Sequence, residues 1–180
     1  MIAWIIVCVV IALLLYAGVT FNELIAERNQ VRAAWADIDV QLQRRHDLVP
    51  QLAATVKGYA DHERATLSAI AELRTRAQAA GSVAERAQIE TQIGAQASQL
   101  LALQERYPDL KASGNFLQLQ RDLVEVEDHL QYARRFYNGA VKQYATRIES
   151  FPDVIVASLF RFQPMPFFET DDREPARVSM

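Results

Sequence analysis

The side chains best suited to chemistry occur in one short run, Arg44-Arg45-His46-Asp47. On a helix, Arg45 falls on the same face as the apolar residues around it. An inward arginine needs a carboxylate partner, because a buried charge without one is costly. The acidic residues that could pair with it are Asp37, Asp39, Asp47, Glu125, Glu127 and Asp128. We interpret the run as an ion-pair network that fixes helix register. The alternative is a contact with lipid headgroups or a partner, so all four residues are candidate interaction residues.

Metal-binding and catalytic patterns are incomplete in this sequence. His62 and Glu63 begin a zinc-protease pattern, but Thr66 stands where the second histidine is required. Di-iron bundles use glutamate three residues before histidine, and none of the three histidines has that neighbour. We find no glycine-rich phosphate loop, serine elbow or cysteine–histidine pairing. The sequence therefore predicts no catalytic, metal-binding or cofactor-binding residue.

Composition excludes some classes of function. The chain has 180 residues and a net charge of -3, whereas a nucleic-acid-binding surface needs a basic face. Its one cysteine, Cys8, cannot form an intramolecular disulfide and lies within an apolar run. We interpret it as a small apolar side chain facing lipid.

The first 20 residues predict a transmembrane anchor. No charged side chain occurs before Glu23, and Trp4 and Tyr16 lie near the ends of the apolar run. About 20 apolar residues are needed for a helix to cross a bilayer, and aromatic residues favour its interfaces. The alternative is a cleaved signal peptide, but the basic leading region and a good cleavage site are missing. We expect a single-pass membrane protein, with the side of the soluble domain left open.

Beyond residue 20, apolar residues recur every three or four positions, which predicts an all-α fold. The anchor is expected to continue into a bundle of long antiparallel helices, covering residues 21–168. The average spacing of about 3.5 is typical of coiled coils. Pro50 should kink or restart the first helix, with Asp47 as a candidate N-cap. Further helices are expected at about 61–80, 83–107 and 115–150.

The C-terminal part changes character. A short helix is expected at about 154–159, and four aromatic side chains after it are candidate interaction residues: Phe160, Phe162, Phe167 and Phe168. They could pack on the bundle or on another chain. Residues 169–180 are polar and predict a disordered tail.

Several motifs occur in a specific order along the chain. They are Ala34-Trp35-Ala36-Asp37-Ile38-Asp39-Val40-Gln41-Leu42, Arg44-Arg45-His46-Asp47-Leu48-Val49-Pro50, Thr55-Val56-Lys57-Gly58-Tyr59, Tyr107-Pro108-Asp109-Leu110-Lys111-Ala112, Asn115-Phe116, Tyr137-Asn138 and Phe151-Pro152. Together they resemble the LemA family of bacterial membrane proteins, over about residues 20–168. The resemblance implies a membrane-tethered bundle without established enzymatic activity, and a role in cell-envelope organisation or membrane-protein quality control. Relatives are linked to membrane-embedded zinc peptidases, and the family assigns no catalytic residues.

Three hypotheses follow. The first is a non-enzymatic membrane-anchored scaffold or adaptor, which contacts lipid through residues 1–20 and forms homo-oligomers. The second is an accessory or regulatory subunit of a membrane-embedded zinc peptidase. The third is a helical bundle that binds a metal or cofactor.

Overall fold

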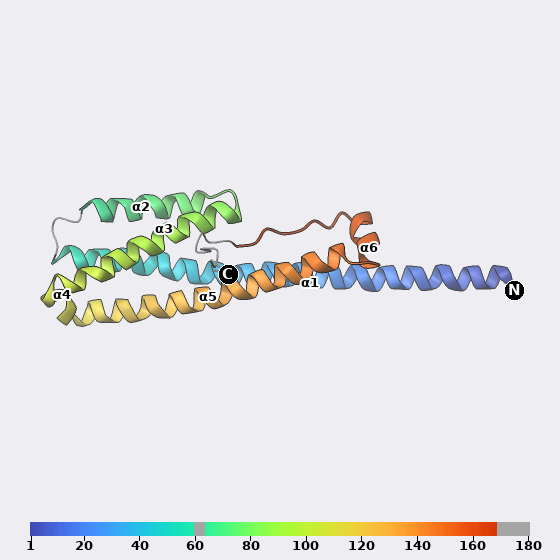
Figure 1. Ribbon diagram of the computed structural model, residues 1–180, viewed down its shortest axis with the longest axis horizontal. Coiled ribbons are helices and arrows are strands. Elements are labelled where there is room, and N and C mark those ends of the chain that lie inside the picture. The colour runs from blue at the N-terminus through green and yellow to red at the C-terminus, as the bar shows by residue number, and fades with distance from the viewer. Residues whose placement is uncertain (60–63, 169–180) are drawn as a thin grey trace, which may run out of the picture. The chain divides into compact units, whose positions relative to one another are not determined.

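The computed structural model describes residues 1–59 and 64–168, and Figure 1 shows their helices. The elements are α1 (Ile2–Lys57), α2 (Arg64–Ala79), α3 (Val83–Ala102), the 3-10 turn η1 (Leu103–Glu105), α4 (Pro108–Ala112), α5 (Gly114–Glu149) and α6 (Asp153–Leu159). The described residues contain no strand, so the predicted all-α fold is confirmed. The predicted disordered tail, 169–180, lies outside the described residues.

The chain divides into two compact units. The first unit consists of Met1–Ala36 and Arg135–Pro166, and the second of Asp37–Arg134 with Phe167 and Phe168. Helices α1 and α5 each contribute to both units.

Helix α1 carries a long lipid-compatible stretch. It is the one helix among the described residues that is long and apolar enough to cross a membrane, and none of that stretch is buried. From Leu24 onward, buried side chains recur three, four or seven residues apart, except for two adjacent pairs. Those of α1 are Leu24, Val31, Ala34, Ile38, Leu42, Arg45, His46, Val49, Leu52, Ala53 and Val56. The exposed apolar stretch is therefore continuous with a helix that packs into the bundle.

Pro50 lies inside α1 without ending it, so the predicted restart is wrong and Asp47 is not an N-cap. A proline inside a helix costs about 3 kcal/mol relative to alanine. On either side of Pro50, Val49 and Leu52 are buried, and each apolar side chain buried contributes about 1.5–3 kcal/mol. Packing therefore outweighs the local cost of the proline.

The second unit is built around a helical hairpin. Helices α2 and α3 run antiparallel in Figure 1 and contact each other. Ser82 caps α3 by accepting a hydrogen bond from the Glu85 backbone N–H at 3.1 Å, and Glu85 accepts one from the Gly81 N–H. This capping arrangement satisfies backbone donors at the start of the helix. The hairpin packs on α1, α4 and α5 through a core that includes Leu52, Val56, Leu73, Ala77, Ile89, Ile93, Leu100, Leu110, Phe116 and Leu123.

Pro108 separates two elements, as its position in the sequence predicts. The α3–η1 segment ends before Tyr107, and Pro108 occupies the first turn of the short helix α4, where its missing N–H is not needed. The sequence did not predict α4, which places Leu110 in the core.

In the first unit, α1 and α5 lie side by side, and α6 follows α5. The Trp35 and Tyr137 rings contact edge to face, with centroids 5.5 Å apart. The Tyr137 hydroxyl donates to the Pro166 carbonyl oxygen at 2.8 Å. This bond ties the segment after α6 to α5.

We predict that Pro50→Ala raises the free energy of unfolding by about 2 kcal/mol, because alanine restores the missing backbone donor and removes the ring clash. Urea denaturation of the detergent-solubilised full chain, followed by circular dichroism, measures this change. As the matched control, Ala54→Pro at an exposed position one turn later should lower stability by about 3 kcal/mol or more. A Pro50→Ala variant less stable than the parent would contradict the prediction.

Candidate functional site

A buried ion cluster in the second unit joins three helices. Arg45 and His46 come from α1, Glu90 from α3 and Glu127 from α5. Arg45, His46 and Glu90 are 2%, 3% and 0% exposed, respectively. The last two inner positions before them, Ile38 and Leu42, are also fully buried, so the helical period carries Arg45 into the interior.

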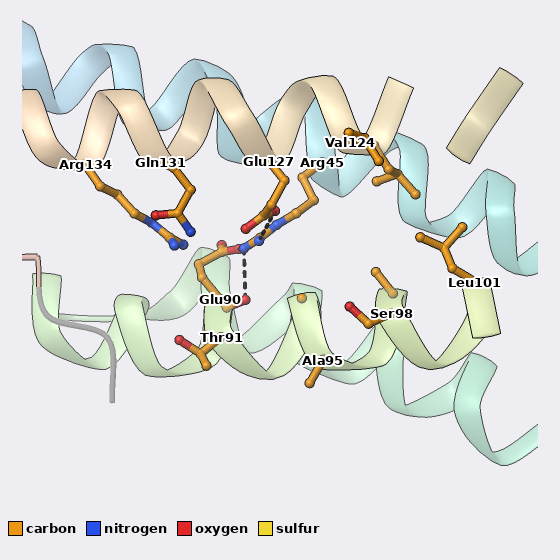
Figure 2. A pocket seen from close by; sticks show the side chains of 13 residues that line it. Arg45, Glu90, Thr91, Ala95, Ser98, Leu101, Val124, Glu127, Gln131 and Arg134 are labelled. Carbon is orange, nitrogen blue, oxygen red and sulfur yellow. Dashed lines mark hydrogen bonds and ion pairs between the residues drawn. The ribbon is translucent and has the colours of Figure 1, made fainter. Parts of the chain in front are cut away.

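Every oxygen of the Glu90 side chain has a cationic or hydrogen-bonding neighbour. Arg45 Nη2 donates to Glu90 Oε2 at 2.5 Å and to the Glu90 backbone oxygen at 2.9 Å. His46 Nε2 lies 2.8 Å from Glu90 Oε1. Arg45 Nη1 donates to Glu127 Oε2 at 3.1 Å. Arg45 thus bridges α3 and α5, and Figure 2 shows its guanidinium between the two carboxylates.

Two opposing effects act on the pKa of Glu90. Burial raises it, but the hydrogen bond with His46 and the charge and hydrogen bond of Arg45 lower it more. The pKa of Glu90 therefore lies below its ordinary value, and the carboxyl is ionised at neutral pH. A general base needs a pKa near the working pH and access to a substrate proton, so Glu90 is suited to pairing rather than to proton transfer.

A cavity of about 400 Å³ lies beside this cluster, between α3 and α5. In Figure 2, Gln131 and Arg134 lie toward one end and Leu101 and Val124 toward the other. Gly94 also lines it, and a Cβ there would lie 3.4 Å from Arg45 Nη1. The missing side chain leaves room for the Arg45 guanidinium.

The candidate run Arg44-Arg45-His46-Asp47 divides between the interior and the surface. Arg45 and His46 point inward, as predicted for Arg45. Arg44 is half exposed and pairs with Glu125 at 3.8 Å. Asp47 is exposed and accepts a hydrogen bond from Gln43 at 3.1 Å.

Of the carboxylates considered from sequence, Glu127 does pair with Arg45, but the closest partner, Glu90, was not among them. Glu90 lies one helical turn before the inner residue Ile93. Extending the apolar periodicity of α3 by one turn is the signal that could have found it.

The tail aromatics occupy different environments. Phe160 and Phe162 contact the Phe21 ring on α1, with centroids 4.7 and 5.7 Å apart. Phe168 is buried, and the Arg134 guanidinium lies 4.9 Å from its ring centre. Phe167 is 41% exposed. The tail therefore combines packed and exposed aromatic side chains.

A second charged cluster lies in the first unit, and the sequence analysis did not identify it. Arg147 on α5 pairs with Glu23, with Glu27 at 2.9 Å and with Asp153 at 2.8 Å. The Tyr16 hydroxyl donates to Asp153 at 2.5 Å. The hydrogen bonds from Tyr16 and Arg147 hold the pKa of Asp153 below its ordinary value. Arg147 thus ties α5 and α6 to α1.

No three metal-binding side chains converge anywhere in the part of the chain that the structure describes. His46 and Glu90 are two such residues, but the guanidinium of Arg45 occupies the position beside them. The geometry is that of a paired structural network.

The structure is a helical bundle, and the exposed apolar stretch of its continuous first helix is a candidate membrane anchor. The LemA family model matches residues 34–180. The chain is also 27% identical to Protein LemA of Metamycoplasma hominis, over 162 residues that cover 87% of this chain and 72% of that protein. The chain belongs to the LemA family.

We predict that Glu90→Gln lowers the free energy of unfolding by about 3–5 kcal/mol, because it leaves the buried Arg45 with a single, partly exposed carboxylate partner, Glu127. The matched control is Glu125→Gln, which breaks an exposed pair and should cost less than about 1 kcal/mol. Urea denaturation of the full chain in detergent compares them. Equal losses in the two variants would show that Glu90 is not a stabilising partner.

We also predict that the acid sensitivity of the fold depends on Glu90. A carboxyl whose pKa is lower in the folded state contributes stability above its unfolded pKa, about 4.3, and loses that contribution as pH falls through the folded pKa. As the pH falls from neutral to acid, the difference in unfolding free energy between the parent and Glu90→Gln should therefore become smaller. Parallel pH profiles would rule out this linkage.

Proposed function

We propose that this protein is a non-enzymatic scaffold or adaptor of the bacterial cell membrane, anchored by residues 1–20 as a single-pass helix and assembled into homo-oligomers. The observation that carries the proposal is the continuity of α1, which joins an exposed apolar stretch to a packed bundle without a loop. Such a helix holds the folded domain close to the bilayer, a geometry suited to organising other membrane components.

Self-association is supported by apolar side chains on the surface of the second unit. Val40 on α1 and Val124 and Tyr132 on α5 are 56%, 53% and 65% exposed. Exposed apolar groups favour a contact that removes them from water. Anchoring in two dimensions raises the effective concentration of one copy near another. A second copy of the chain is therefore the partner we favour for α5, with Arg44 and Asp47 as candidate polar contacts.

We predict that Tyr132→Cys, in a chain whose only native cysteine is replaced by Cys8→Ser, forms disulfide-linked dimers when oxidised in native membranes. Gln118→Cys, also exposed on α5, is the matched control for random collision. Non-reducing electrophoresis should show several-fold more dimer for the Tyr132 position. Equal and low dimer yields at both positions, with only monomers after mild detergent extraction, would contradict the oligomer.

The same detergent extract tests the other two hypotheses. Recovery of an intact membrane zinc peptidase with the monomeric chain would favour the accessory subunit. A stoichiometric transition metal in the purified protein would favour the metal-binding bundle.

A further inference from the structure

Helix α6 and the residues that flank it expose an unusual amount of apolar surface. Phe151 is 82% exposed, Ile155 61%, Leu159 74% and Phe160 52%. Ile155 and Leu159 are four residues apart and so share one face of the helix. On its other side, Val156 and Ala157 are buried. The helix is therefore apolar on both sides, and its outer apolar face is uncovered in the structure.

Two contacts fix the level of α6 along α1. Near its start, Asp153 accepts the hydrogen bond from Tyr16, and after its end Phe160 packs on Phe21. Phe21 lies five positions after Tyr16, or roughly 7.5 Å along the helix axis. The uninterrupted apolar side chains of α1 end in this interval, at Val19. Helix α6 therefore lies where α1 would leave the hydrocarbon.

The geometry of the following turn holds α6 in place. The Arg161 N–H bonds to the Ser158 oxygen and the Phe162 N–H to the Ala157 oxygen, the pair of bonds of a Schellman motif. Arg161 adopts the left-handed conformation that this motif requires, with φ of 55°. The turn brings the Phe162 ring against Phe21, with the Arg28 guanidinium 5.3 Å from its centre.

The carboxylate of α6 is paired, and a cation follows the helix. The one carboxylate inside the helix, Asp153, pairs with Arg147, which it shares with Glu23 and Glu27, and accepts a hydrogen bond from the Tyr16 hydroxyl. Arg161, directly after Phe160, is exposed and can approach a lipid phosphate. An exposed apolar face with a cation beside it can be buried at the boundary between headgroups and acyl chains.

We propose that α6, with Phe151 and Phe160, is a second membrane contact that inserts its apolar face into the bilayer interface beside the exit of α1. The occupant is the lipid bilayer, because Asp153 and Phe160 contact α1 at Tyr16 and Phe21, where its exposed apolar run ends. Contacts of both α1 and α6 with the bilayer set the tilt and rotation of the anchored unit. The inference rests on the proposed anchoring by residues 1–20.

The test places an environment-sensitive nitrobenzoxadiazole label on a single cysteine. The full chain carries Cys8→Ser with Leu159→Cys, and a second variant carries Ile155→Cys instead. The matched control is Arg135→Cys, at an exposed position on α5 in the same unit. This position lies twelve residues, or roughly 18 Å along the helix axis, before Arg147, which pairs with Asp153 of α6. Each protein is reconstituted in vesicles of phosphatidylethanolamine and phosphatidylglycerol, with or without a lipid that carries a nitroxide near its headgroup.

We expect blue-shifted emission and several-fold stronger nitroxide quenching at positions 155 and 159 than at position 135. Vesicle flotation separates the two levels of the proposal. Protein that does not float with vesicles overturns the anchor and the α6 contact together. Floating protein whose labels at 155 and 159 are quenched no more than the control overturns the α6 contact alone. Blue-shifted emission without lipid quenching would also overturn it, and would assign the face to a protein neighbour.

Discussion

The second unit depends on one constraint, the complete burial of the Glu90 carboxylate. A charge without water needs both its oxygens satisfied, and the two donors, Arg45 and His46, are adjacent on α1. Arg45 in turn needs a second acceptor, which Glu127 on α5 provides. Because a buried charge tolerates loss of its partner poorly, sliding any of these three helices by one turn would be costly. The ion cluster therefore sets the register that apolar packing alone leaves loosely determined.

Ion pairs between α1 and α5 also occur in the first unit, but there the positions of the arginine and the carboxylates are exchanged. There the arginine, Arg147, belongs to α5, and the carboxylates of Glu23 and Glu27 belong to α1. This cluster is more exposed than that of Glu90, so each of its pairs contributes less. Its importance is positional, since it adds Asp153 and thereby holds α6 at the level of Tyr16. Helix α1 thus engages each unit through charge pairing as well as through its apolar stripe.

Local pattern predicted most of the elements. The periodicity from Phe116 to Ile148 indicated the long helix α5, and Tyr107-Pro108 marked the end of the segment before it. Prediction failed where a local preference met a strong tertiary term. Pro50 reads as a break, but the buried side chains around it keep α1 helical. Glu90 reads as a solvated glutamate, because its partners lie 44 and 45 residues away in the chain.

The sequence by itself determined the helical fold class, through the three-to-four spacing of apolar residues after Glu23. The apolar stretch before Glu23 predicts a membrane anchor. The sequence also predicted that Arg45 faces inward, because the helical period places Arg45 on the same face as the apolar residues around it. Only the tertiary structure decided which carboxylates meet that arginine, which tail aromatics are packed, and where α6 lies along α1. Helical periodicity specifies the face that a residue occupies, whereas the pairing of faces depends on desolvation and contacts between residues distant in the chain.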